Sequence, residues 1–156
     1  MSKVYRRNAN RYVPSNREHA AFEETLPIGT YVVCIDPEIG FYFERIADFR
    51  ISHKLYGETE RHADRILNTF THRPNTTGVM LAGEKGSGKS LLAKKIAVNA
   101  AERGMVTLVI NTPFCGDSFN KFIQSIEQPC VILFDEFEKV YDEEAQESLL
   151  TLLDGV

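Results

Sequence analysis

The segment of residues 83–90, which reads G-E-K-G-S-G-K-S, restricts the possible fold more than any other stretch of this sequence. It satisfies the pattern G-x-x-x-x-G-K-[ST], in which glycines let the backbone turn sharply and bring its N–H groups close to an anion. Such a loop needs a strand before it and a helix after it, because the anion lies at the helix N-terminus. The sequence therefore predicts a strand–loop–helix unit.

The flanks of this loop have the composition of the two required elements. Residues 78–82 form a short apolar run typical of a buried strand, and residues 89–103 have the pattern of a helix that ends at Gly104. Strands and helices continue to alternate downstream, which favours a three-layer α/β fold, a parallel sheet with helices on both faces. The expected strands cover 78–82, 105–110 and 130–134, and the expected helices cover 58–70, 89–103, 119–126 and 143–154.

A different pattern precedes this unit. Residues 31–35 and 41–46 are rich in β-branched and aromatic side chains, and the D-P-E-I-G segment between them has turn chemistry, which predicts a small β-hairpin. The first 20 residues contain few apolar side chains and carry five basic residues against one acid, so we expect a flexible tail there. The expected domains are a basic tail at 1–28, a hairpin region at 29–52 and a core at 53–156.

The glycine-rich loop also carries side chains suited to a nucleotide. The ammonium group of Lys89 can reach the β- and γ-phosphates, and the hydroxyl of Ser90 can coordinate Mg²⁺. The backbone N–H groups of the loop and of the helix that follows would hold the phosphates. The expected nucleotide-binding residues of this segment are Gly83, Glu84, Lys85, Gly86, Ser87, Gly88, Lys89, Ser90 and Leu91.

A second motif lies at the end of the strand expected at 130–134. Its apolar residues lead directly into Asp135 and Glu136. Asp135 would hold Mg²⁺ beside Ser90, and Glu136 would act as general base for an attacking water, an effect worth about 10²–10⁴ in rate. Lys89 and Glu136 are therefore candidate catalytic residues, and Ser90 and Asp135 are candidate metal ligands.

Absent patterns narrow the class of protein. The segment 120–123, N-K-F-I, lacks the aspartate of the guanine-reading pattern N-K-x-D, which argues against a GTPase. No apolar run approaches the roughly 18 residues that a membrane span needs. The N-terminal residues also lack the apolar stretch of a secretory signal. We therefore expect no membrane segment and a cytoplasmic location.

Taken together, these motifs resemble those of an AAA+ ATPase over residues 53–156. Residues 83–90 match the family's Walker A motif, and residues 131–136 match its Walker B motif with the catalytic glutamate. Residues 148–155, S-L-L-T-L-L-D-G, are similar to the family segment that follows Walker B. The resemblance implies a P-loop NTPase fold with a three-layer parallel sheet.

Two further segments add to this resemblance. Leu55-Tyr56-Gly57 is similar to the family's adenine-contacting segment, which adds Tyr56 and Gly57 to the expected nucleotide contacts. The short span 111–129 resembles the Bcs1-like branch and related phage-encoded AAA proteins, for which the location would be the host cytoplasm. In many AAA motors this span holds a pore loop with an aromatic residue. The segment 114–117 is either a reduced pore loop or a strand-to-helix turn with Phe114 packed inward.

The resemblance implies ATP, ADP and Mg²⁺ as ligands, and ATP hydrolysis that remodels a macromolecule, either protein or nucleic acid. Family members usually work as homo-oligomeric rings. The family's sensor strand, arginine fingers and helical lid would follow Val156, so we expect a fold that is incomplete at its C-terminus and the N-terminal part of a longer protein. The activity of the 156-residue chain alone stays open. Two alternatives also remain: a nucleotide-gated interaction module with little catalysis, and a P-loop small-molecule kinase.

Overall fold

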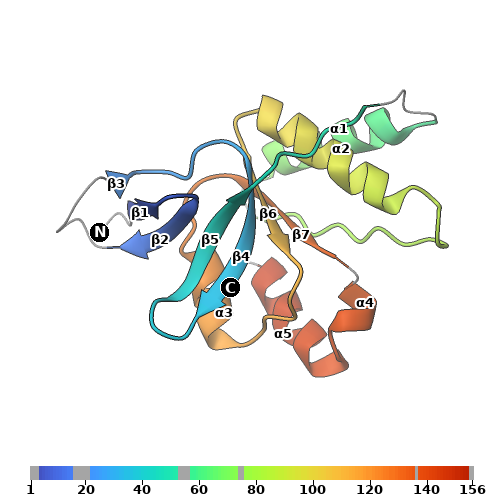
Figure 1. The fold of residues 1–156 in the computed structure, drawn as a ribbon. Coiled ribbons are helices and arrows are strands. Elements are labelled where there is room, and N and C mark those ends of the chain that lie inside the picture. The colour runs from blue at the N-terminus through green and yellow to red at the C-terminus, as the bar shows by residue number, and fades with distance from the viewer. Residues whose placement is uncertain (1–3, 16–21, 53–56, 74–75, 136, 155–156) are drawn as a thin grey trace.

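A computed structural model describes residues 4–15, 22–52, 57–73, 76–135 and 137–154. Seven strands form one sheet in the order β3-β1-β2-β5-β4-β6-β7, with helices packed around its C-terminal part (Figure 1). The strands are β1 Val4–Asn8, β2 Arg11–Ser15, β3 Phe22–Glu23, β4 Thr30–Asp36, β5 Gly40–Ile46, β6 Val106–Ile110 and β7 Cys130–Phe134. The helices are α1 Thr59–Thr71, α2 Lys89–Glu102, α3 Asp117–Gln124, α4 Phe137–Val140 and α5 Glu143–Asp154.

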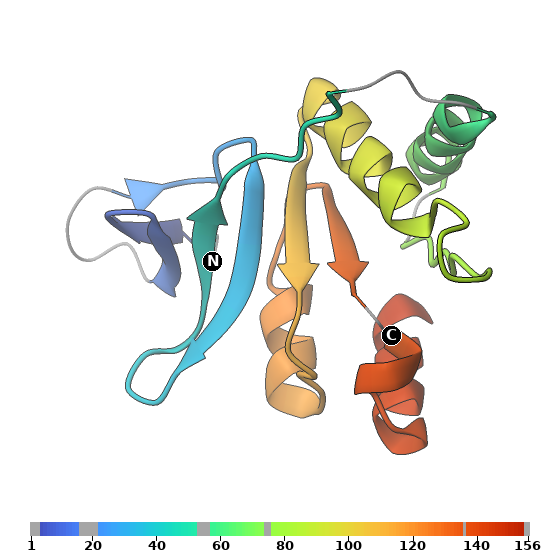
Figure 2. The same ribbon diagram turned by 45° about the vertical axis from the view of Figure 1, so that its right-hand side comes forward.

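The sheet is mixed, because the expected hairpin and the other N-terminal strands join the parallel strands in one sheet. Strand β4 pairs in parallel with β6, and β6 pairs in parallel with β7 (Figure 2). The remaining pairs are antiparallel. The turn after β4 explains the reversal, because a carboxylate oxygen of Asp36 accepts hydrogen bonds from the backbone N–H groups of Glu38 and Ile39 at 2.9 and 3.3 Å. Such a tight turn returns the chain as an antiparallel hairpin.

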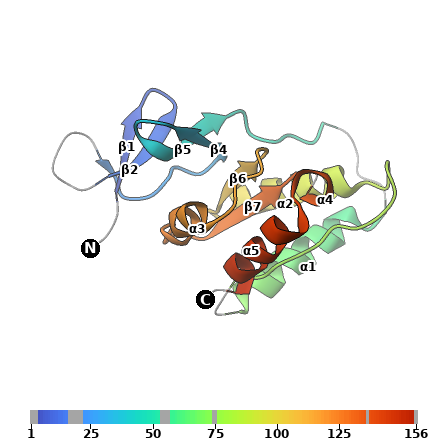
Figure 3. The same ribbon diagram turned by 90° about the horizontal axis from the view of Figure 1, so that it is seen from below.

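Residues 4–15 form the hairpin of β1 and β2, where the sequence had suggested a flexible tail. The aromatic side chains of this basic segment account for the difference. Tyr5 and Tyr12 are each only 4% exposed, and their rings contact Phe43 and Tyr31 at centroid distances of 5.8 and 5.4 Å. Buried aromatic rings contribute enough apolar area to order a short hairpin on an existing sheet. Figure 3 shows the N-terminal strands gathered at one end of the molecule.

Helices cover both faces of the sheet around β6 and β7. Because successive strand residues point to opposite faces, Val131 and Ile132 pack into different clusters. Val131 packs with α1 and α2, whose buried residues include Leu67 and Ile96. Ile132 packs with α3 and α5 on the other face. Because Val131 of β7 packs against α2, the two elements belong to the same layered part of the fold.

Residues 78–82 are not a strand, so this expectation from the sequence was wrong. The segment runs alongside the helices without joining the sheet (Figure 1), and the side chains of Val79 and Met80 are 48% and 71% exposed. A strand needs a neighbour that satisfies its backbone groups. Within the described residues β7 pairs only with β6, and no strand pairs with 78–82. The one-turn helix α4 was not expected from the sequence.

Candidate functional site

The glycine-rich loop has the backbone geometry that its sequence demands. Gly83, Gly86 and Gly88 adopt φ angles of 146°, 86° and 90°, which residues with a side chain rarely adopt. A Cβ atom on Gly83 would also lie 2.8 Å from Oγ of Ser87. The loop therefore depends on glycine for both its turns and its close packing, and its residues 83–88 are exposed to solvent.

Lys89 points back over the loop. Its Nζ atom donates hydrogen bonds to the backbone carbonyl oxygens of Gly83 and, at 2.8 Å, Glu84. The N–H of Ser87 donates to the same Glu84 oxygen at 3.1 Å, which closes the turn. The ammonium group thus lies within the curve of the loop, where a phosphate oxygen could replace the two carbonyls as its partner.

The N-terminus of α2 is open to an anion. Gly88 is its N-cap residue, no side chain caps the helix, and its first turn holds no acidic residue. The first N–H groups of a helix have no partner inside the helix, and the helix dipole makes this end positive. Ser90 is exposed and Leu91 half-buried in this first turn. The loop and the helix end therefore fit a phosphate group.

Asp135 lies at the carboxyl end of β7 and is exposed. Its N–H donates to the carbonyl of Ile110, the last residue of β6, at 3.3 Å. The tight turn at Gly104, with φ 78°, returns the chain from α2 into β6, so α2 runs opposite to the strands. The N-terminus of α2 and the end of β7 consequently face the same edge of the sheet (Figure 2).

The donor set at this edge suits Mg²⁺ bound with a nucleotide. Among the described residues there is no group of three or more histidine, cysteine, aspartate or glutamate side chains that could hold a metal alone. Magnesium in nucleotide sites instead takes one or two protein oxygens and completes its shell with phosphate oxygens and water. The exposed oxygens of Ser90 and Asp135 fit that requirement.

Two of the expected site residues, Tyr56 and Glu136, lie outside the described residues. Gly57 is described, with φ 78°, immediately before α1. It borders an open depression of about 710 Å³ beside the middle of α2. The other lining residues are Phe49, Arg50, Ile51, Glu60, Lys95 and Val98.

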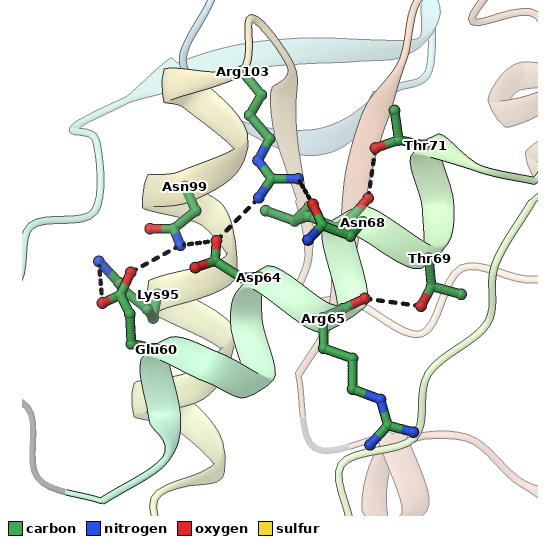
Figure 4. Close-up of polar contacts among 10 residues, drawn as sticks. Glu60, Asp64, Arg65, Asn68, Thr69, Thr71, Lys95, Asn99 and Arg103 are labelled. Carbon is green, nitrogen blue, oxygen red and sulfur yellow. Dashed lines mark hydrogen bonds and ion pairs between the residues drawn. The ribbon is translucent and has the colours of Figure 1, made fainter.

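A polar ladder between α1 and α2 was not foreseen (Figure 4). Glu60 pairs with Lys95 at 2.8 Å, and the amide of Asn99 donates to Glu60 at 3.2 Å. Three further bonds extend the ladder, from Asn99 to Asp64 at 3.1 Å and from Arg103 to Asp64 at 3.0 Å and to Asn68 at 2.8 Å. On each helix the ladder residues are spaced by four, so a search for matched polar stripes would have found them.

The segment after β6 contains Phe114, for which two interpretations were open. Its ring contacts Phe41 on β5 at 5.2 Å and Phe119 on α3 at 5.8 Å, and it is partly buried against the main core. The structure therefore favours the interpretation of a strand-to-helix turn with Phe114 packed inward.

The comparisons with known proteins gave one match. The family model described as "ATPase family associated with various cellular activities (AAA)" matches residues 79–156, which is half of the chain. The matched range includes the glycine-rich loop, α2 and the end of β7. Comparison with curated proteins and with solved structures gave no match. None of the described helices is both long enough and apolar enough to span a membrane.

Proposed function

Because the chain belongs to the AAA family of ATPases, we propose that residues 83–91 and Asp135 bind ATP with Mg²⁺ for hydrolysis. One observation carries this proposal. An exposed loop of glycines with positive φ leads into a helix whose N-terminus has no side-chain acceptor, and the ammonium group of Lys89 lies over that loop. Three sources of positive potential thereby converge where a triphosphate would bind.

Each residue then has a specific task. The loop N–H groups hold the phosphates, and Lys89 exchanges its carbonyl partners for phosphate oxygens. Ser90 and Asp135 hold the Mg²⁺, which supplies charge neutralisation on the phosphates. Glu136 orients and deprotonates the attacking water. Tyr56 and Gly57 contact the base.

The wider biological role is also a proposal and extends the family relationship. An AAA module commonly works in oligomers, and we propose a homo-oligomeric ring that uses ATP hydrolysis to remodel a macromolecule. The match with the AAA family supports nucleotide binding and hydrolysis in general terms. The relation to the Bcs1-like or phage-encoded branch, the cytoplasmic location and the choice between protein and nucleic acid as substrate belong to this proposal.

The test of nucleotide binding is Lys89→Ala. This variant should bind ATP about 10- to 100-fold more weakly, because a hydrogen bond to a charged group contributes about 1.5–3 kcal/mol. Lys94→Ala is the matched control, since Lys94 is an exposed lysine elsewhere on α2. Titration calorimetry with MgATP measures both affinities. Equal ATP affinity in the Lys89→Ala variant and the wild type would refute the assignment of the loop.

A further inference from the structure

Tyr141 lies beside the turn that carries Asp135, although the proposed chemistry gives it no role. It follows α4 and is only 3% exposed. Its ring contacts Phe134 at a centroid distance of 6.0 Å and Phe137 at 5.1 Å, and those two rings contact each other at 6.0 Å. Phe134 is the residue before Asp135, and Phe137 is the second residue after it. The three contacting rings therefore come from the chain on both sides of Asp135.

The same turn is fixed to the end of β6 at two points. The N–H of Asp135 donates to the carbonyl of Ile110 at 3.3 Å. The hydroxyl of Tyr141 donates to the carbonyl of Thr112 at 3.2 Å. Ile110 and Thr112 are two residues apart on the segment that leaves β6. One short stretch of backbone therefore accepts hydrogen bonds from both Asp135 and Tyr141.

Both partners of the Tyr141 hydrogen bond are themselves held in place. The N–H of Phe114 donates to the Thr112 carbonyl at 2.7 Å, which orients this oxygen. The side-chain amide of Gln146 donates to the Tyr141 carbonyl at 2.8 Å. Burial, with a smaller contribution from Cys115, raises the pKa of Tyr141 to about 12, so its hydroxyl keeps its proton at neutral pH.

We propose that Tyr141 is a positioning residue whose hydrogen bond to Thr112 sets the place of the Asp135 carboxylate for Mg²⁺. This inference rests on the proposed function of the loop and of Asp135. The ring contacts alone would keep this region packed, but a hydrogen bond has a preferred direction, so it fixes Tyr141 relative to the end of β6. A carboxylate that is displaced by a fraction of an ångström binds Mg²⁺ less well, because this ion demands near-ideal octahedral geometry.

The experiment compares ATP affinity with Mg²⁺ and with EDTA, since the ratio of the two dissociation constants isolates the metal contribution. Tyr141→Phe removes only the hydroxyl. We expect it to lower the Mg²⁺ enhancement by about three- to tenfold, the range of a typical net hydrogen bond, while affinity in EDTA stays unchanged. Asp135→Asn sets the lower limit of the enhancement.

The matched control is Tyr31→Phe. Tyr31 is also buried, at 0% exposed, and its hydroxyl also donates to a backbone carbonyl, that of Pro27, at 2.7 Å. It lies on β4, so a loss of one buried hydroxyl there should leave the Mg²⁺ enhancement at the wild-type value. Phe137→Leu opens the ring cluster from its other side and should also lower the enhancement.

The outcomes separate this inference from the proposed function. If Tyr141→Phe keeps the wild-type enhancement, the positioning role is refuted whatever Phe137→Leu does, and the nucleotide site stands. If Tyr31→Phe lowers the enhancement as much as Tyr141→Phe does, the effect is general destabilisation and the positioning role is again refuted. A wild-type protein that binds ATP under neither condition refutes the proposed function, and the role of Tyr141 with it.

Discussion

Arg45 joins the start of β4 to the segment that follows β5. Its guanidinium donates to the carbonyls of Thr30 and Ile46 at 3.0 and 2.7 Å and forms two bonds of 2.8 Å with Asp48. A carboxylate oxygen of Asp48 in turn accepts the N–H of Thr30 at 2.9 Å. The guanidinium fills the space where a Cβ atom on Gly29 would lie. These few atoms fix the place at which the hairpin meets β6.

The Arg45 guanidinium, followed by the contacts from Thr30, holds the pKa of Asp48 below its ordinary value of 3.8. A carboxyl group with a lowered pKa in the folded state stabilises the fold above its unfolded pKa, and that contribution is lost as the pH falls through the folded pKa. We therefore predict that Asp48→Asn lowers the free energy of unfolding at pH 7, and that its difference from the wild type shrinks below about pH 4.

Urea unfolding at a series of pH values between neutrality and acid measures this difference. Glu102→Gln is a suitable control, because Glu102 is an exposed carboxylate at the end of α2. A difference between Asp48→Asn and the wild type that stays constant over the whole pH range would contradict the ion pair as its cause.

The sequence predicts the loop residues because their pattern is local, but it does not predict the role of Tyr141. The glycines, Lys89 and Ser90 act within one continuous segment, so their spacing alone indicates a phosphate site. Tyr141 acts through the carbonyl of Thr112, which only the tertiary structure brings to it. Every residue has a backbone carbonyl, so no sequence pattern can mark which one accepts the Tyr141 hydrogen bond.

At the scale of elements, α1 and α2 pack side by side in parallel through two adjoining stripes. The apolar stripe contains Leu67 and Ile96, and the polar ladder beside it centres on Asn99. Asn99 is 4% exposed and donates to two carboxylates, while its own side-chain oxygen is buried without a partner in the described part of the chain. The packing of α1 on α2 therefore depends on a polar group that burial makes costly.

We predict that Asn99→Ala lowers the free energy of unfolding by about 0.5–1.5 kcal/mol, since the buried Asn99 amide loses its hydrogen bonds to the half-exposed carboxylates of Glu60 and Asp64. Thermal or urea unfolding followed by circular dichroism measures the change. Asn10→Ala is the matched control, because the Asn10 amide is exposed and donates to the Arg45 carbonyl over a long distance of 3.4 Å. Equal losses in the two variants would show that burial of the ladder contributes nothing.

Most helices and strands of the C-terminal two thirds could be predicted from their periodicity. Helix α2 and the strands β6 and β7 lie where the sequence indicates, because their apolar spacing matches how they are buried. The apolar segment 78–82 has equally good strand composition, yet it has no partner strand among the described residues. Strand formation depends on a neighbour that composition does not reveal. Domain boundaries stay a prediction.

At the scale of the whole molecule, the N-terminal strands belong to the same core as α3 and α5. Phe43 on β5 is fully buried and its ring lies 4.8 Å from that of Phe122 on α3. Phe41 contacts Phe114, Phe119 and Phe122 at 5.2–5.7 Å. The ring cluster spans the junction between the hairpin and the part that matches the AAA family. The hairpin is thus a structural part of this core.

We predict that a chain without residues 1–46 does not fold into a cooperative unit. Its β6 edge would lose the ladder with β4, and the aromatic face of α3 would be exposed to water. Circular dichroism melting would show a broad transition or none, and light scattering would show aggregation. The full chain with Ile39→Ala, a change at the exposed hairpin tip, should melt like the wild type. A sharp transition in the truncated chain would instead show that the hairpin is dispensable.

The parallel pairing of β4 with β6 also has a mechanical meaning. Three residue pairs, Thr30–Thr107, Tyr31–Leu108 and Val32–Val109, join the two strands. A pull on the hairpin tip acts along β4, so it loads all the hydrogen bonds of this junction at once, in shear, and does not peel them apart one by one. Traction on the N-terminal strands is therefore passed to β6, which is held through the Ile110 and Thr112 carbonyls to the turn at Asp135.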